Sequence, residues 1–273
     1  MPFRTLVVHL CGDEKSSQRL RFAAGIARSL GARLTGLFAR LAVVPPVGVS
    51  VGDAPADYAQ AEAAARAEFE QVAQGLEGGF QDLRRFAEAD LISQMVDYSR
   101  HFDLVVLGQG KTRTDLVPPD LAEQIIVLSG RPALVLPEVG EFSGVGKRPI
   151  FAWSDSRSSA RGFADGLGLV KPGADALIVS LSKPEDKDVL AYRKQSLNLA
   201  AAHLAAHGVT ARTEQLALSE IGLMDALLNR ASDHSADLLA IGAFGGGGYP
   251  LFSRGSGSRY MLKHMTLPVL FSH

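Results

Sequence analysis

Short apolar runs alternate along the chain with longer segments in which apolar residues recur every three or four positions. The first run is Thr5–Leu10, and the segment behind it carries Leu20, Ala23, Ala24, Ala27 and Leu30 at helical spacing. Strands that are apolar throughout, rather than alternating with polar residues, are typical of parallel sheets covered by helices on both faces. The pattern therefore predicts a doubly wound α/β fold.

The whole pattern occurs twice. Strands that end in glycine, at 104–108 and 238–242, lie 134 residues apart (108 to 242), which is the length of a domain. The other clear strands are expected at 5–10, 32–38, 132–136, 149–153, 176–181 and 268–271, with one weaker strand in each half. We therefore expect two domains, 1–139 and 147–273, each with a five-stranded parallel sheet.

The segment Glu138 to Lys147 is glycine-rich and has little to bury, so it is the expected linker. A Pro/Gly-rich insertion at 43–55 occurs only in the first half. It is expected to form a surface loop, and its role is open.

The composition argues against several classes of protein: those that bind nucleic acid or membrane surfaces, secreted proteins, and those with a Cys/His metal site. The 273 residues carry a formal net charge of -1, which gives no electrostatic case for a nucleic-acid or membrane-surface partner. No apolar run approaches the roughly 20 residues that span a bilayer. The first residues run straight into a strand without the pattern of a secretory signal. Cys11 is the one cysteine, which fits a reducing cytoplasm, and no Cys/His cluster suggests a metal.

Candidate chemistry is sought behind the strands, because open parallel sheets bind ligands beyond the carboxyl ends of their strands. Gly242 and Gly245 follow an apolar strand, and Gly255–Ser256 comes nine residues later at the start of a helical segment. Glycine lets backbone amides approach a phosphate, and a serine hydroxyl at a helix start adds a donor. This predicts a phosphate site in the C-terminal half. The alternative is a plain flexible loop, and neither the dinucleotide fingerprint nor a Walker A loop fits the segment.

The first half lacks an equivalent segment. Gly110–Lys111–Thr112 looks like the end of a Walker A loop, but Val105 stands where that pattern needs a glycine. A polar loop is the favoured interpretation. We therefore expect the nucleotide loop of the first domain to be degenerate.

Residues after the first strand of each half are the next candidates. Ser154 and Asp155 could hold ribose hydroxyls, although Asp155 is rather expected to cap the following helix. Cys11, at the matching place in the first half, is expected to be a small buried filler.

Five further side chains have a structural interpretation beside the functional one. Arg254 and Arg259 flank Gly255–Ser256 and either pair with phosphates or stay solvated. His203 and His207, one helical turn apart, are expected on a solvated helix face, because no third metal ligand is near. Trp153 is expected in the core rather than as a platform for a base.

At this point the sequence resembles the universal stress protein family, in its tandem form with two domains on one chain. Its ATP-binding members carry G-x2-G-x9-G-(S/T) after the fourth strand, and this pattern is reproduced by Gly242, Gly245, Gly255 and Ser256. The endings at 265–270 and 130–135 are similar to the family's terminal strand. The resemblance covers nearly the whole chain.

The resemblance implies a cytoplasmic stress-response protein that binds ATP or a related adenine nucleotide, alone or with Mg²⁺, in its C-terminal domain. The implied site consists of Ser154, Leu181, Ile241, Gly242, Gly245, Gly255, Ser256, Gly257 and Ser258. The family usually holds the ribose with an aspartate, for which this chain has Ser154 and Cys11. Losing the charged acceptor for the two ribose hydroxyls should weaken binding by about 1.5–3 kcal/mol if nothing compensates.

The same resemblance implies that the last strands of the two domains pair across a pseudo-twofold axis, and a further homodimer of the whole chain is compatible with it. We expect no efficient catalysis, because the glycine segment holds no general base, lysine or carboxylate metal site. The alternative function is an interaction or scaffold protein of the same fold without nucleotide. An adenylating enzyme is disfavoured, because no Ser-Gly-Gly-x-Asp-Ser motif follows the first strand of either half.

Overall fold

The computed structural model describes residues 3–42, 56–84, 87–110, 116–182, 187–217, 222–245 and 255–273. The chain forms two compact units that divide between Ser143 and Gly144. This division falls inside the expected linker, Glu138 to Lys147. The insertion at 43–55 lies outside the described residues.

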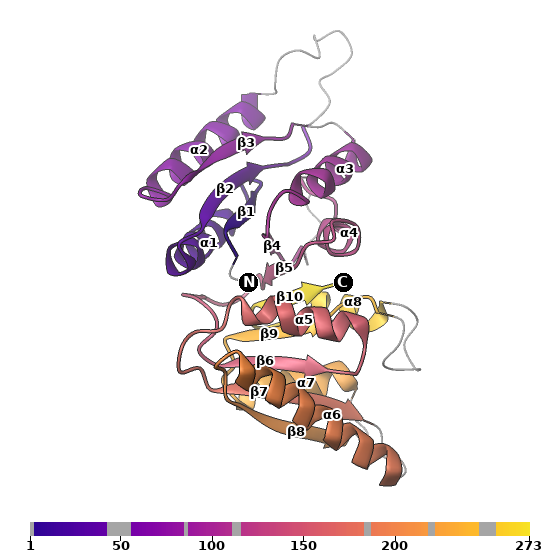
Figure 1. Cartoon of the computed structure of the whole chain (residues 1–273). Coiled ribbons are helices and arrows are strands. Elements are labelled where there is room, and N and C mark those ends of the chain that lie inside the picture. The colour runs from indigo at the N-terminus through magenta and orange to yellow at the C-terminus, as the bar shows by residue number, and fades with distance from the viewer. Residues whose placement is uncertain are drawn as a thin grey trace. The chain divides into compact units, whose positions relative to one another are not determined.

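The N-terminal unit is a doubly wound α/β domain. Its elements follow in the order β1 (Thr5–Leu10), α1 (Ser16–Leu30), β2 (Arg33–Phe38), α2 (Ala56–Val72), β3 (Gly78–Asp82), α3 (Glu88–Ser99), β4 (Leu104–Gly108), α4 (Leu121–Leu128) and β5 (Ala133–Leu136). The strands lie parallel in the order β3-β2-β1-β4-β5. Helices α1 and α2 cover one face, and α3 and α4 cover the other (Figure 1).

The C-terminal unit repeats this plan. Its elements are β6 (Pro149–Trp153), α5 (Arg157–Leu167), β7 (Ala176–Ser182), α6 (Lys187–Ala206), β8 (Ala211–Ala217), α7 (Leu223–Asp233), β9 (Leu238–Gly242), α8 (Ser256–His264) and β10 (Val269–Ser272). The strands are parallel in the order β8-β7-β6-β9-β10. The order reverses beside β6, as it does beside β1, so a ligand site is expected at the carboxyl ends of these strands.

The apolar pattern located the elements closely. The expected bounds of β1, β4, β6 and β9 are the observed ones. Gly31 ends α1 in the left-handed conformation, at φ 61°, as its place after the helical pattern predicts. Helix α2 is shorter than expected, since it ends at Val72 rather than near 76.

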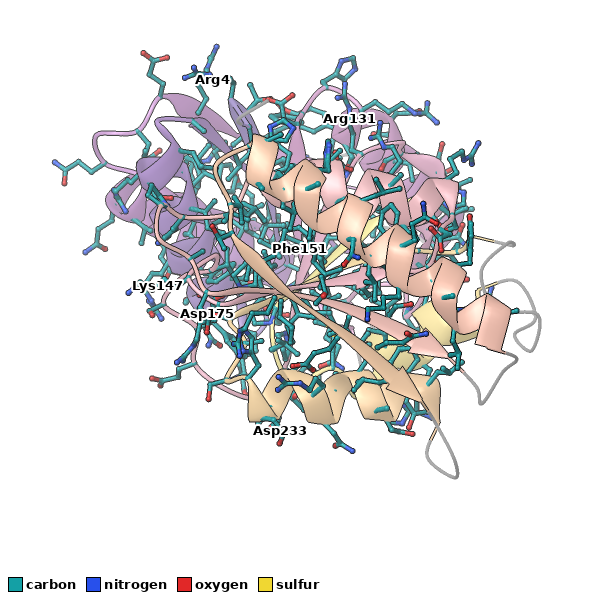
Figure 2. All side chains as sticks on the ribbon, turned by 60° about the horizontal axis from the view of Figure 1, so that its bottom comes forward. Arg4, Arg131, Lys147, Phe151, Asp175 and Asp233 are labelled. Carbon is teal, nitrogen blue, oxygen red and sulfur yellow. The ribbon has the colours of Figure 1, made fainter. Side chains whose placement is uncertain are left out.

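Large apolar side chains fill the space between sheet and helices. Phe151 on β6 is fully buried and packs on Phe163 of α5 with ring centroids 4.9 Å apart. Figure 2 shows Phe151 inside the C-terminal unit, whereas Lys147, Asp175 and Asp233 lie at its surface. Within the described ranges, no helix is long and apolar enough to cross a membrane.

One aspartate in each unit ties the start of the central strand to the strand beside it. Asp103, just before β4, accepts hydrogen bonds from the amides of Arg4 and Thr5 at 2.8 and 3.0 Å and from the Thr5 hydroxyl at 3.1 Å. Asp237, just before β9, accepts from the amides of residues 146, 147 and 148 at 2.8–3.1 Å. Burial raises the pKa of Asp103, but the bonds from Arg4 and Thr5 outweigh it and hold the pKa below its usual value.

Replacing Asp103 by Ala should lower the free energy of unfolding by about 1.5–3 kcal/mol, because hydrogen bonds to a charged acceptor are lost. Denaturant titration at neutral pH measures this change. The difference from wild type should shrink as the pH falls below the ordinary aspartate pKa, where the carboxylate is protonated in the unfolded chain. Asp97→Ala, which breaks an exposed pair with Arg100, is the matched control and should cost under about 1 kcal/mol. Equal losses in the two variants would contradict the role of Asp103.

Candidate functional site

A pocket of about 100 Å³ lies at the carboxyl ends of β6, β7 and β9 in the C-terminal unit. Its lining consists of Ala152, Ser154, Ser156, Ser158, Leu181, Met224, Leu227, Ile241, Gly242, Phe244, Gly245, Gly255, Gly257 and Ser258. Eight of the nine expected site residues are among them, and the ninth, Ser256, begins α8. The structure thus brings the expected residues together from four separate segments of the chain. None of the described lining residues is charged.

The glycines behind β9 meet different physical demands. A Cβ on Gly242 would overlap the backbone of Ser158 and Ser159, so glycine there allows α5 to pack on β9. A Cβ on Gly245 would overlap only the hydroxyl of Ser158, a side chain that lines the pocket. Gly255 is left-handed at φ 85° and sits before the first turn of α8. Gly242 therefore serves packing, whereas Gly245 keeps the pocket open.

Two helices begin at this pocket. Ser156 caps α5 by accepting a hydrogen bond from the Ser159 amide at 3.1 Å, and Gly255 and Gly257 lie at the start of α8. Free amides and the positive ends of the helix dipoles make such positions favourable for an anion. The geometry is that of an anion site made of neutral groups.

Serine hydroxyls form a row along the pocket. Ser156 Oγ lies 3.1 Å from Ser154 Oγ and 3.3 Å from Ser158 Oγ, so the three hydroxyls form one hydrogen-bonded chain. Across the pocket, Ser258 Oγ accepts from the Phe244 amide at 2.9 Å. Ser256 Oγ is buried and has no hydrogen-bond partner among the residues that the structure describes. Hydroxyls donate and accept, so such a row can bind either a phosphate or a sugar hydroxyl.

Asp155 departs from both of its expected roles. Ser156, not Asp155, caps α5, because Asp155 is left-handed at φ 49° and its side chain turns away. Its carboxylate accepts from Trp153 Nε1 at 3.1 Å and from the Ser196 hydroxyl on α6. Asp155 is therefore outside the pocket and does not replace the missing ribose-binding aspartate. Trp153 is half-buried rather than a core residue and packs edge-on against Phe163.

Arg259, His203 and His207 are not among the lining residues of the pocket. Arg259 is exposed, with its guanidinium 5.9 Å from the centre of the ring of Phe244, which does line the pocket, while Arg254 lies outside the described residues. His203 on α6 and His207, just after the end of α6, are exposed, as expected for a solvated face. In the part of the chain that the structure describes, no group of three or more His, Cys, Asp or Glu residues could hold a metal ion.

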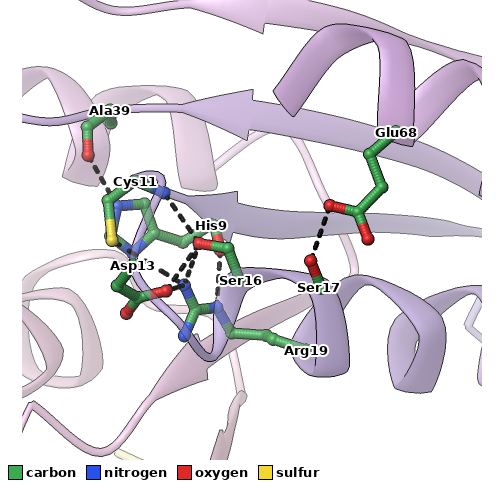
Figure 3. Close-up of polar contacts among 8 residues, drawn as sticks. All are labelled: His9, Cys11, Asp13, Ser16, Ser17, Arg19, Ala39 and Glu68. Carbon is green, nitrogen blue, oxygen red and sulfur yellow. Dashed lines mark hydrogen bonds and ion pairs between the residues drawn. The ribbon is translucent and has the colours of Figure 1, made fainter. Parts of the chain in front are cut away.

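The same place in the N-terminal unit holds a buried arginine instead of a row of serines. Arg19 on α1 is 3% exposed, and its Nε donates to the His9 carbonyl at 2.6 Å. Its Nη2 lies 3.3 Å from Asp13 Oδ1 and 3.2 Å from Ser16 Oγ, and Cys11 Sγ is 3.9 Å away. Figure 3 shows the guanidinium at the centre of this cluster. Lys111 and Thr112, the expected degenerate loop, lie outside the described residues.

Burial and the guanidinium set the protonation of this cluster. Burial, helped by Arg19, lowers the pKa of His9 to about 4, so His9 is neutral and donates from Nε2 to the Ala39 carbonyl at 2.7 Å. Burial raises the pKa of the Cys11 thiol, in keeping with the expected buried filler. Burial also raises the pKa of Asp13, but Arg19 and Ser16 outweigh it and lower the pKa overall.

Matching hydrogen bonds align the two units residue by residue. Ser16 Oγ accepts from the Cys11 amide, and Ser159 Oγ accepts from the Ser154 amide, each at 3.2 Å. Arg19 follows Ser16 by three residues, and Gly162 follows Ser159 by three residues, so Arg19 and Gly162 occupy corresponding positions. A Cβ on Gly162 would come within 2.9–3.1 Å of the backbone of Ile241 and Gly242. An arginine is therefore incompatible with the close approach of α5 and β9.

Sequence reasoning missed several of these residues. Ser158 and Met224 lie within helices, where the search for residues behind strands did not look. The alternation Ser154–Ser156–Ser158 was a usable signal for the hydroxyl row. Arg19 was also missed, although aligning the halves on Cys11 and Ser154 places it opposite Gly162.

The buried, neutral His9 should make the N-terminal unit sensitive to acid. Because the pKa of His9 is about 4 when folded and 6.5 when unfolded, the unfolded chain takes up the proton first as the pH falls. As the pH falls from 6.5 to 4, the free energy of unfolding of the wild type should fall by about 3 kcal/mol more than that of His9→Gln. Gln keeps a donor for the Ala39 carbonyl. Denaturant titrations over this pH range measure the slope.

The matched control is His203→Gln on the exposed face of α6, which should follow the wild-type slope. A His9→Gln variant whose stability falls with pH as steeply as that of the wild type would show that His9 does not titrate in this range.

Comparison with known proteins extends the description of the fold. No protein-family model matches the chain, and no curated protein matches it. A universal stress protein from Archaeoglobus fulgidus DSM 4304 is 14% identical, with 98% of this chain and 95% of that chain covered, at a TM-score of 0.72. A putative universal stress protein from Pseudomonas aeruginosa UCBPP-PA14 is 15% identical, with 99% and 93% covered, at a TM-score of 0.64.

A shorter universal stress protein from Archaeoglobus fulgidus, solved in complex with dAMP, is 20% identical over 50% of this chain and 98% of its own, at a TM-score of 0.35. The two full-length likenesses extend over both of the units described above. The chain therefore has the universal stress protein fold, with two such domains in one chain.

Proposed function

We propose that the C-terminal domain binds ATP or a related adenine nucleotide, and that the protein works in the cytoplasm as a nucleotide-binding stress-response protein. The observation that carries the proposal is the convergence of two helix starts and a row of serine hydroxyls on one glycine-lined pocket.

The polar part of the pocket suits a phosphate. Backbone amides at the starts of α5 and α8 and the hydroxyls of Ser156 and Ser158 are the donors available there. Ser256, which begins α8, does not line the pocket, although its hydroxyl has no hydrogen-bond partner among the described residues. The enclosed part of the pocket, about 100 Å³, is smaller than most ligand pockets and would take one phosphate, while the ribose and the base would lie along the open part of the same lining.

The apolar part of the lining suits a base. Leu181, Met224, Leu227 and Ile241 belong to three different elements and face the same pocket. Apolar walls with a few placed polar groups are typical of sites for small molecules that carry a ring. The adenine would lie against this wall.

The ribose would meet hydroxyls instead of a carboxylate. Ser154 stands at the end of β6, and the carboxylate of Asp155 is engaged by Trp153 and Ser196. Losing a charged acceptor lowers affinity by about ten- to a hundredfold. We therefore expect weak, reversible binding.

Binding rather than turnover is the proposed activity. Phosphoryl transfer needs positioned cations and a group that orients the attacking water. The described residues of the pocket lining include no lysine, arginine, aspartate, glutamate or histidine. Incubation with ATP should release no phosphate above the uncatalysed rate.

Replacing Gly245 by Val should abolish nucleotide binding without unfolding the domain. The new side chain would displace the Ser158 hydroxyl and fill the pocket, whereas among the described residues its Cβ meets side-chain atoms of Ser158 and no backbone atom. Calorimetric titration with ATP should show the affinity reduced by at least about tenfold.

Gly79→Val is the matched control, because Gly79 lies on edge strand β3 of the other unit, where a Cβ would meet nothing within 4 Å. It should bind ATP like the wild type. The proposal fails if the wild type and Gly245→Val bind equally, or if neither binds at millimolar ATP.

A further inference from the structure

The N-terminal unit contains a larger cavity than the proposed nucleotide site. It measures about 620 Å³ and lies at the carboxyl ends of β1, β4 and β5, beside the starts of α1 and α4. Most of its wall is apolar and includes Leu107, Leu116, Val117, Leu121, Leu136 and Val139. Val139 is 79% exposed, the highest value among the large apolar side chains of the described residues. A cavity of this size and character is typical of sites for small organic molecules.

Arg19 holds this cavity open. In the C-terminal unit, Gly162 lets α5 touch the backbone of β9, but the corresponding Arg19 places its guanidinium between α1 and the end of β4. Its Nη1 lies 2.5 Å from where a Cβ on Gly108 would be, and both residues line the cavity. The arginine thus accounts for the space between helix and strand that the other unit lacks.

The same guanidinium offers a free edge to a ligand. Nε and Nη2 are engaged by His9, Cys11, Asp13 and Ser16. Nη1 makes no hydrogen bond within the described residues, although the Arg19 side chain is only 4% exposed. Nη1 is not among the fully buried polar atoms that lack a partner, so it is open to the cavity, and a carboxylate is the acceptor that guanidinium binds best.

The charges of the described lining residues favour a ligand with one negative group. Among these residues, Asp13, Glu14 and Glu138 lie with Lys15 and Arg19. A single carboxylate can pair with Nη1 while Asp13 stays on Nη2. We propose that this cavity is a second ligand site, which binds a small molecule with one carboxylate and an apolar body.

The probe is 4-methylpentanoate, titrated into the full chain by calorimetry at millimolar concentration. Two analogues share its carbon skeleton: 4-methylpentan-1-ol lacks the charge, and 4-methylpentylamine reverses it. We expect the carboxylate to bind at least about tenfold more tightly than either analogue. Arg19→Gln should reduce its affinity by a similar factor.

Because Arg19→Gln leaves Asp13 without its partner and can unfold the unit, a second variant tests the cavity itself. Ala122→Phe on α4 adds a ring to the cavity wall and leaves the ionic cluster intact, and it should also abolish binding. Arg21→Gln, an exposed residue of α1 outside this cavity, should bind like the wild type, and circular dichroism checks that each variant is folded. The proposal is overturned if 4-methylpentanoate does not bind, if the alcohol or the amine binds as tightly, or if folded Ala122→Phe still binds.

Discussion

The contact between the first helix of each domain and the strand beside the central one decides what each domain can hold. In the C-terminal domain this contact is backbone against backbone, because Gly162 and Gly242 have no side chains to separate α5 from β9. In the N-terminal domain Arg19 enters the same contact and lies against Gly108. Two domains with one strand order therefore present a small neutral pocket in one case and, in the other, a large and mostly apolar cavity with an ionic cluster at its wall.

Buried polar groups are stabilised in different ways at the two cavities. The C-terminal pocket uses hydroxyls and amides, which cost little to bury as long as they bond to one another, as Ser154, Ser156 and Ser158 do. The N-terminal cluster buries a charge, which is tolerable only with a partner such as Asp13 and with carbonyl and hydroxyl acceptors around it. His9 in this cluster stays neutral, since a second buried positive charge beside Arg19 would be unfavourable.

Much of this architecture was predictable from the sequence, because it depends on the apolar pattern and on glycines. The runs of β1, β4, β6 and β9 gave their bounds, and the spacing of Gly242, Gly245 and Gly255 gave the place of the pocket. The direction of a side chain was not predictable. Asp155 has a left-handed backbone and turns towards α6, which no local pattern indicates. The contact of Arg19 with Gly108 was not predictable either, because it depends on the distance between α1 and β4, which are far apart in the chain.

The burial of Cys11 has a practical consequence for studying this protein. The chain has one cysteine, and its thiol is buried with a raised pKa, so it reacts slowly with alkylating reagents. A cysteine introduced on an exposed surface, for example in place of Tyr192 at 63% exposure, would then be the fast-reacting thiol. Fluorophores and spin labels can therefore be attached one site at a time to the otherwise native chain, and distances between the two domains become measurable in solution.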